Sequence, residues 1–239
     1  MTAMNNSNEH LEAMDDSPRK SLFWDWYARC YDGLLQTIPY QRLLARTLSH
    51  VPSNARSLLD AGCGTGNLLS AVHRELPDIQ LSGIDFSTQM LGRARRKVSG
   101  AHIIQGDLNA ALPYADGSFD VVTCVNVLYA VATPEKTLSE LKRVLAPGGT
   151  LIVSSPLAKP RIGAFIAEHA RELGWWRTLP MLGRLAVLIL FNLLIVRRGQ
   201  QQTYHFLDFK KVRELLQTPH IQSAYSNQNW FASVTKGAL

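Results

Sequence analysis

Three acidic residues and a run of glycines are the residues best suited to bind a ligand. Asp60 precedes the turn-forming stretch Gly62–Gly66, and Asp85 and Asp107 each follow a later short apolar run. Glycines at this spacing permit a tight turn and let backbone N–H groups approach a ligand closely. The GxGxG spacing differs from the GxGxxG of dinucleotide-binding proteins, and no Lys-Ser/Thr pair of a nucleoside triphosphate site follows it. The negative charge of Asp60 favours a ligand with a cationic group.

The acids after the next two apolar runs favour a ligand built on adenosine. Asp85 ends the second expected strand, where an acid can bind the hydroxyl groups of a ribose. Phe86 can pack on an adenine ring, and Asp107 can accept a hydrogen bond from its amino group. The three acids in this order predict one binding pocket.

The elements that must position these residues alternate between strand and helix. Apolar runs separated by helical stretches of about 10–15 residues are typical of a parallel sheet. The expected strands are 57–61, 80–85, 101–105, 119–124 and 150–154, and the expected helices are 67–75, 87–98 and 134–145. Right-handed crossovers then place ligands at the carboxyl ends of the strands.

The C-terminal part of the chain predicts an antiparallel hairpin. Residues 207–217 are expected to be helical, and strands 220–226 and 229–236 are joined by a tight turn at 227–228. The predicted fold class is therefore α/β, with a doubly wound, mostly parallel, seven-stranded Rossmann-like sheet and an antiparallel C-terminal hairpin.

Five stretches resemble the class I S-adenosylmethionine-dependent methyltransferases, in particular the type 11 group. They are LLDAGCGTG (58–66), GIDFS (83–87), QGDL (105–108), FDVVTCVNVLYAV (119–131) and LKRVLAPGGTLIVS (141–154). The resemblance implies an enzyme (EC 2.1.1.-) that uses S-adenosylmethionine and no metal, and that transfers the methyl group by in-line SN2 displacement. It implies that Asp60, Gly62, Cys63, Gly64 and Gly66 hold the methionine end of the cofactor, Asp85 the ribose, and Asp107 with Leu108 the adenine, and that Cys124 lies near the amino acid portion.

An aromatic stretch near the N-terminus resembles a helix that covers the cofactor in phospholipid N-methyltransferases and quinone C-methyltransferases. Tyr27 and Tyr31 lie one helical turn apart in this stretch. Both are expected to contact the cofactor, and Tyr31 also the substrate; plain packing is the alternative.

The resemblance implies that the acceptor pocket follows the fourth strand, at Asn126 and Tyr129. Relatives often have His where this chain has Tyr129, so the need for a general base stays open. The candidates for a catalytic residue are Tyr129, His169 and His205.

An insertion at 156–206 combines apolar and basic character. It contains the apolar run 185–196, the pair Trp175 and Trp176, and seven cationic residues against two glutamates. The run is too short to cross a bilayer, which requires about 20 residues. One interpretation is a peripheral membrane-surface element, and the other is a lid helix packed on the core with solvated arginines. The expected domains are a disordered tail (1–20), a helical cap (21–52), the cofactor-binding core (53–155), this lid (156–206) and a C-terminal helix and hairpin (207–239).

Composition narrows the function classes. The 239 residues carry a formal charge of +6, and the three cysteines lie too far apart for a metal site or a disulfide framework. The first 20 residues lack the apolar core of a secretory signal, so a cytoplasmic protein with possible contact to an anionic membrane is expected. Nucleic acid is disfavoured, because the basic residues interleave with an apolar run and the Asn-Pro-Pro-Tyr tetrapeptide of base methylation is missing.

The resulting hypothesis is a methyltransferase acting on a hydrophobic or amphiphilic small molecule (lipid, isoprenoid or quinone-like) near a membrane. The alternatives are a soluble methyltransferase for a polar thiol, amine or carboxylate, and a non-catalytic cofactor-binding protein.

Overall fold

The computed structural model describes residues 28, 31–159, 161–180, 182–183, 186, 190, 193–194, 205–218 and 220–237. The expected tail at 1–20 and Tyr27 lie outside the described residues, as do most positions of the apolar run 185–196.

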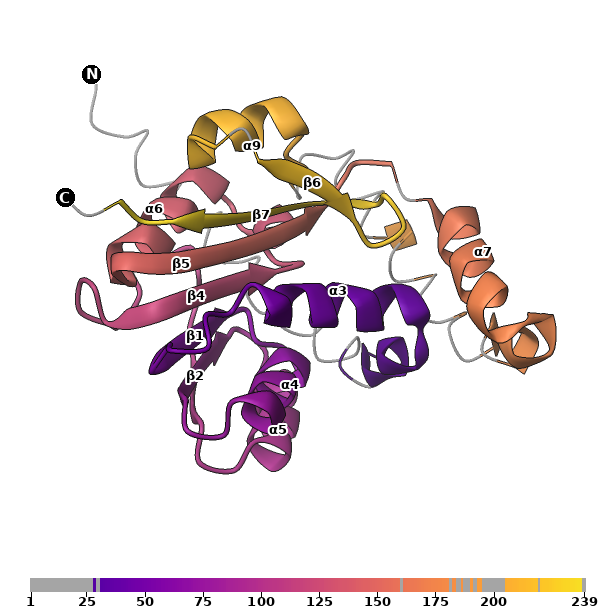
Figure 1. Cartoon of the computed structure of the whole chain (residues 1–239), viewed down its shortest axis with the longest axis horizontal. Coiled ribbons are helices and arrows are strands. Elements are labelled where there is room, and N and C mark those ends of the chain that lie inside the picture. Colours follow the sequence, from indigo (N-terminus) through magenta and orange to yellow (C-terminus); the bar gives the residue numbers. More distant parts are fainter. Residues whose placement is uncertain are drawn as a thin grey trace, which may run out of the picture.

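Seven strands of the described residues form one sheet with the spatial order β3-β2-β1-β4-β5-β7-β6 (Figure 1). Strands β1 to β5 pair in parallel, and β7 is antiparallel to both of its neighbours. The strands are β1 (Ser57–Ala61), β2 (Gln80–Asp85), β3 (His102–Gln105), β4 (Phe119–Val125), β5 (Leu145–Pro156), β6 (Ile221–Ala224) and β7 (Asn229–Thr235). The predicted α/β fold with a mixed seven-stranded sheet and a C-terminal hairpin is confirmed.

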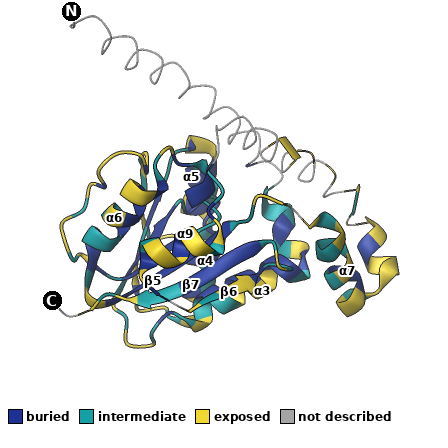
Figure 2. Cartoon of the chain, turned by 90° about the horizontal axis from the view of Figure 1, so that it is seen from above, coloured by how far each residue is buried: buried dark blue, intermediate teal, exposed yellow. Residues whose placement is uncertain are grey.

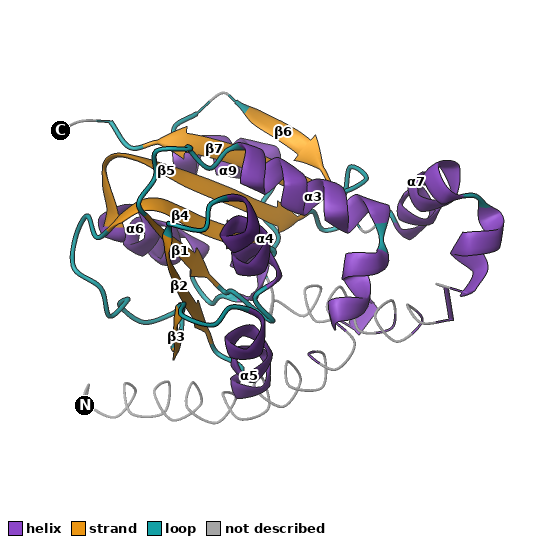
Figure 3. Ribbon diagram, turned by 60° about the horizontal axis from the view of Figure 1, so that its bottom comes forward, coloured by secondary structure: helices purple, strands orange, loops and turns teal. Residues whose placement is uncertain are grey.

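Helices cover both faces of the sheet because successive strand residues point to opposite sides. Leu58 and Ile152 pack with one group of helices, and their neighbours Leu59 and Val153 pack with the other. One group is α3 (Ile38–Ser49), α4 (Asn67–Glu75) and α5 (Thr88–Lys97), and the other is α6 (Pro134–Val144) and α9 (Phe209–Leu216) (Figure 3). The strands between the two groups are largely buried (Figure 2).

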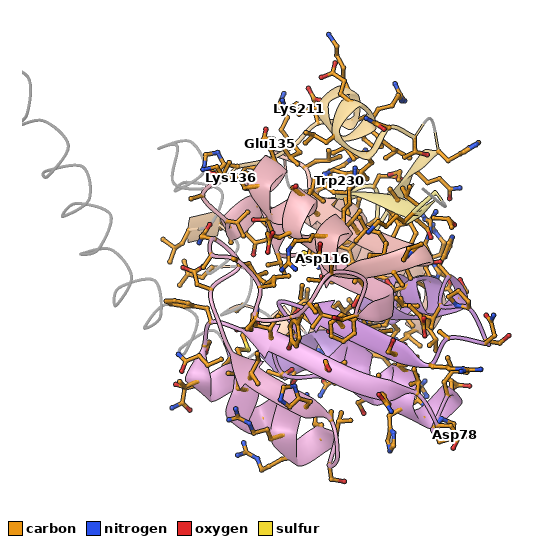
Figure 4. All side chains as sticks on the ribbon, turned by 90° about the vertical axis from the view of Figure 1, so that its left-hand side faces the viewer. Asp78, Asp116, Glu135, Lys136, Lys211 and Trp230 are labelled. Carbon is orange, nitrogen blue, oxygen red and sulfur yellow. The ribbon has the colours of Figure 1, made fainter. Side chains whose placement is uncertain are left out.

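Helices α6 and α9 meet through an ion pair at their outer surface. Lys211 Nζ lies 3.4 Å from Glu135 Oε1, and Figure 4 shows both side chains at the periphery. Trp230, labelled in the same view, is fully buried in the core beneath these helices.

Helix α7 (Ile162–Leu173) lies beyond the end of the sheet where the parallel strands finish (Figure 1). Arg42 of α3 connects it to the rest of the fold, with guanidinium nitrogens 2.6 Å from Glu168 and 2.5 Å from Glu172. The same end of the sheet carries two short 3-10 helices, η1 (Asp32–Gln36) and η2 (Leu128–Ala130).

The connection between β6 and β7 is longer than the expected turn at 227–228. Four residues, 225–228, join the strands, and β6 ends at Ala224 rather than at residue 226. Tyr225, Ser226 and Asn227 all adopt positive φ, between 54° and 58°, so they cannot continue an extended strand. This connection also anchors the start of the insertion, because the backbone carbonyl of Gln228 accepts a hydrogen bond from Leu157 N at 2.7 Å.

Candidate functional site

The glycine turn connects β1 to α4 at the carboxyl edge of the sheet. Gly62, Gly64 and Gly66 have φ values of 79°, 53° and 76°, a region that residues with a side chain rarely adopt. At Gly62 a Cβ atom would lie 2.3 Å from Cγ2 of Val127, so a side chain is excluded on steric grounds as well. The turn is therefore packed closely against Val127 at Gly62, and Gly62 and Gly64 are half-buried.

Asp85, the last residue of β2, is held against this turn by backbone donors. Its Oδ2 accepts from Gly64 N at 2.8 Å, and its Oδ1 accepts from Ser87 N at 2.9 Å. Ser87 caps α5, since its Oγ accepts from Met90 N. Asp85 stands at the end of a strand, where an acid can bind the hydroxyl groups of a ribose.

Asp60 is buried at the end of β1, and its charge state is sensitive to its surroundings. Burial raises the pKa of its carboxyl group to about 7; the hydrogen bond from Thr123 Oγ1, 2.7 Å long, acts against this, and the negative charge of Asp85 adds to it. A cation placed next to Asp60 would favour the ionised carboxylate.

The residues expected around an adenine lie at the ends of β2 and β3. Asp107 is exposed, and its Oδ1 accepts from both the backbone and the side-chain nitrogen of Asn109. Leu108 is buried, and Phe86 is half-buried with its carbonyl bound to the amide of Gln105 at 3.2 Å. The structure thus brings the acids and the glycine turn to one edge, as the sequence predicts.

Cys63 and Cys124 are buried free thiols next to the acids of this edge. Burial raises the pKa of both thiols, and the negative charge of Asp60 raises both further. Both therefore stay protonated near neutral pH, which fits a packing role and not a nucleophilic one.

Tyr31 lies over the glycine turn. A Cβ atom at Gly64 would be 3.8 Å from Tyr31 Cε1, and the Tyr31 hydroxyl accepts from Tyr40 Oη at 3.4 Å. A cavity of about 20 Å³, enough for one water molecule, lies beneath and is lined by Tyr31, Tyr40, Leu44, Asp60, Gly62, Cys63, Asn67, Leu68 and Val125. Tyr27, the second tyrosine expected here, lies outside the described residues.

A charged network that the sequence analysis missed ties Tyr31 to the turn. Asp32 Oδ1 accepts from Thr65 Oγ1 and from Lys97 Nζ, both at 2.6 Å. Lys97 also donates to Asn67 Oδ1 at 2.5 Å, and Asn67 Nδ2 donates to the Tyr40 hydroxyl at 3.3 Å. Thr65 lies between two glycines of the predicted turn, so its place near the site follows from the sequence. No sequence pattern distinguishes Lys97 at the end of α5.

The residues expected to line the acceptor pocket follow β4. Asn126 has a φ of 61°, and its Oδ1 accepts from Asn229 Nδ2 at 2.5 Å. Tyr129 is buried and stacks in parallel on Phe206 with 5.8 Å between ring centroids. His205 joins the same group, because its backbone N–H donates to the Tyr129 carbonyl at 2.7 Å. Nothing in the sequence pointed to Asn229.

His169 lies at the contact between α7 and α3. It is buried, and its Nδ1 accepts from the backbone N–H of Ile38 at 3.2 Å. Burial lowers the pKa of the imidazole, so the neutral form with hydrogen on Nε2 is favoured. As a general base it stays a prediction.

Exposed apolar side chains gather in the insertion. Trp176 is 90% exposed, and Trp175 and Leu179 are also exposed. The described residues of the apolar run are exposed as well; those with large side chains are Leu190, Leu193 and Leu194. These described side chains are therefore not packed into the core.

Two searches of the described part of the chain gave negative results. None of its helices has the length and apolar character to span a bilayer. Within the same residues, no group of three or more His, Cys, Asp or Glu side chains is placed to hold a metal ion.

Comparison with known proteins shows similarity to methyltransferases. A family model described as "Methyltransferase domain" matches residues 59–153, which include the glycine turn and all three acids. A demethylmenaquinone methyltransferase from Thermus thermophilus is 39% identical over 133 residues, 54% of this chain and 59% of that protein. The match thus spans less than two thirds of this relative.

A second relative is covered more fully. A phosphatidylethanolamine N-methyltransferase from Cereibacter sphaeroides is 32% identical over 142 residues, 54% of this chain and 68% of that protein. Among solved structures, a putative methyltransferase in complex with the Trm112 activator of Haloferax volcanii superposes with a TM-score of 0.66 at 17% identity. This superposition covers 91% of this chain and 97% of the other.

Proposed function

The chain belongs to the class I S-adenosylmethionine-dependent methyltransferases, and from this premise we propose that it transfers a methyl group from S-adenosylmethionine to a hydrophobic or amphiphilic small molecule. Lipid, isoprenoid and quinone-like acceptors all fit this class. The transfer takes place at the carboxyl edge of the sheet, close to the surface of a membrane.

One observation carries the cofactor half of this proposal. The Asp85 carboxylate and the buried Asp60 flank a glycine turn, and Asp85 is bound to that turn by a 2.8 Å hydrogen bond to Gly64 N. Asp85 can bind the ribose of an adenosine, and a positive charge on the ligand would favour the ionised form of Asp60. Tyr31, tied to the turn through Asp32, would cover the bound cofactor.

The proposed reaction depends more on how the acceptor is positioned than on acid–base catalysis. The sulfonium of the bound cofactor supplies an already activated methyl group. The protein then has to exclude water and align the acceptor, and such orientation can supply roughly 7–11 kcal/mol of a barrier. A base is required only if the acceptor is protonated at the working pH, and Tyr129, His169 and His205 are the candidates for that role.

The surface of the insertion supports a hydrophobic or amphiphilic acceptor. Exposed Trp175, Trp176 and Leu179 stand among Arg171 and Arg177, which combines apolar surface with positive charge. Such a combination is typical of elements that lie in the interface of an anionic membrane. The two relatives named above for a menaquinone precursor and for phosphatidylethanolamine fit the same class of acceptor.

Two measurements test the proposal. Calorimetry with S-adenosylmethionine should give one bound molecule per chain. Incubation with methyl-labelled cofactor and a cell extract, separated into lipid and aqueous fractions, should place the label in the lipid fraction. A label in the aqueous fraction would favour a polar acceptor, and cofactor binding with no labelled product would favour a non-catalytic protein.

A further inference from the structure

A chain of hydrogen bonds ends at Asn126. The backbone carbonyl oxygen of Trp230 accepts from Ser154 Oγ at 2.8 Å. Ser154 Oγ accepts from Asn229 Nδ2 at 3.1 Å, and the same Nδ2 donates to Asn126 Oδ1 at 2.5 Å. Ser154 and Asn229 are buried, so unmatched polar atoms along this relay would be costly.

The direction of the relay is fixed at its buried end. A carbonyl oxygen can only accept, so Ser154 Oγ donates its single hydrogen to the Trp230 carbonyl. Ser154 Oγ must therefore accept from Asn229 Nδ2. Turning the Asn229 amide over would present its oxygen to both neighbours, and Ser154 could then satisfy only one of its two partners. The relay would keep two hydrogen bonds instead of three. Asn229 therefore donates to Asn126, and the Nδ2 group of Asn126 is turned away from it.

Asn126 follows β4 at the carboxyl edge of the sheet, the edge at which the acceptor is proposed to bind. Asn126 is half-buried at the end of β4. It stands between Val125, which lines the cavity under Tyr31, and Val127, which packs against Gly62. Its left-handed backbone, with φ at 61°, is a conformation that Asn tolerates better than most residues and that is often found at functional sites.

We propose that the Nδ2 group of Asn126 binds and orients the methyl acceptor, which must then carry a hydrogen-bond-accepting oxygen near the atom that is methylated. This inference rests on the proposed function and narrows its acceptor class. A phenolic or quinone oxygen and a phosphate oxygen of a lipid headgroup share the required chemistry. An aliphatic amine without oxygen does not have it.

The direction of the relay can be tested without any acceptor. In nuclear magnetic resonance of the isotope-labelled full chain, the side-chain amide hydrogens of Asn229 should exchange with solvent at least about tenfold more slowly than those of Asn126. Asn126→Gly identifies the Asn126 signal by its loss, and glycine accepts the positive φ at this position. Slower exchange at Asn126 than at Asn229 would overturn the relay.

The donor role is tested by Asn126→Asp. This change keeps the size of the side chain and the bond from Asn229 but replaces the outward donor with an acceptor. The KM for an oxygen-bearing acceptor should rise at least about tenfold, with no weakening of S-adenosylmethionine binding by calorimetry. Gln80→Glu, the same amide-to-carboxylate change at an exposed residue at the start of β2, should leave KM unchanged.

The oxygen requirement is tested with three probes added to the protein saturated with S-adenosylhomocysteine. A naphthoquinol and a short-chain phosphatidylethanolamine carry the oxygen, and hexylamine lacks it. The Asn126 side-chain signal should shift with at least one oxygen-bearing probe and not with hexylamine, and the probe that shifts it identifies the source of the oxygen. An equal response to all three, or to none, would overturn the inference. Failure to bind S-adenosylmethionine would count against the proposed function itself.

Discussion

The cofactor side and the acceptor side of the same sheet edge are built in different ways. On the cofactor side, the glycine turn binds the Asp85 carboxylate through a backbone group, Gly64 N, only 21 residues away. On the acceptor side, side chains distant in sequence meet, as in the bond between Asn126 and Asn229, 103 residues apart. We therefore expect substitutions at Asn126 or Asn229 to affect the acceptor side without changing the bond between the glycine turn and Asp85.

The largest effect on the cofactor side is expected for Asp85→Ala. Loss of a charge-assisted hydrogen bond costs about 1.5–3 kcal/mol, so the Kd for S-adenosylmethionine should rise at least about tenfold in calorimetry. Asp78→Ala removes an exposed carboxylate at the periphery of the molecule (Figure 4) and should leave the Kd unchanged. An equal rise in both variants would mean that overall charge, and not the turn, holds the cofactor.

A somewhat smaller effect is expected from pH. With the pKa of Asp60 raised to about 7, the ionised fraction grows from about a tenth at pH 6 to about nine tenths at pH 8. Because the cationic cofactor binds the ionised form, its Kd should fall roughly tenfold over this range. Asp60→Asn should flatten the profile, and a wild-type Kd that does not vary with pH would contradict this account of Asp60.

The raised pKa of Asp60 also makes folding stability depend on pH, but stability falls with rising pH whereas cofactor affinity increases. The folded state holds the Asp60 proton more tightly than the unfolded state, whose carboxyl titrates near 3.8. The contribution of Asp60 to the free energy of unfolding is therefore greatest below about pH 4 and is lost as pH rises toward 7. Denaturant unfolding of the wild type and of Asp60→Asn across this range should show that loss only in the wild type.

The network behind Tyr31 should have an intermediate effect. Asp32→Asn keeps the shape of the side chain but removes the charge that attracts Lys97 and Thr65. Since the side chains of Asp32 and Lys97 are partly exposed to solvent, the loss is about 1 kcal/mol, or about fivefold in the Kd for the cofactor. Glu75→Gln, in an exposed ion pair with Arg74, should change nothing. If Asp32→Asn altered acceptor binding alone, the network would belong to the acceptor side.

The smallest effect is expected in the insertion, and it should leave the cofactor side untouched. Arg177→Ala should lower partition into anionic vesicles about threefold at moderate salt, because each basic residue near such a surface contributes at most about 1 kcal/mol. Arg96→Ala removes the same charge from an exposed position on α5 and serves as the matched control. Equal losses, or vesicle binding that does not weaken with salt, would remove the support for a membrane contact.

The same contrast explains what the sequence could predict. The glycine turn, Asp60 and Asp85 were identified because a turn leaves a local signal and strand ends of a parallel sheet meet at one edge. The seven strands were identified because their apolar runs are short and regularly spaced, although the extent of β5 and the hairpin turn were not. The last two residues of β5, Ser155 and Pro156, pair with β7, so the C-terminal end of β5 depends on a strand that comes much later in the chain. Its early start at Leu145, which pairs with Phe119 of β4, was also missed.

Lys97 and Asn229 escaped prediction for a physical reason. Each is an ordinary polar residue in its own segment, and it gains a role only through partners that folding brings near. Lys97 meets Asp32 from 65 residues away, and Asn229 meets Ser154 from 75 residues away. His169 shows the converse, since a histidine that stood out in the sequence binds a backbone group of α3.

The reversed direction of β7 has a consequence for the order in which the molecule becomes competent. Its first residue reaches the carboxyl edge only because the strand runs against its neighbours, and it follows Asn126 by 103 residues. A chain emerging from the ribosome exposes the glycine turn and its acids long before Asn229 is made. The partner that completes the hydrogen bonds of the Asn126 side chain is therefore among the last residues of the fold to be synthesised.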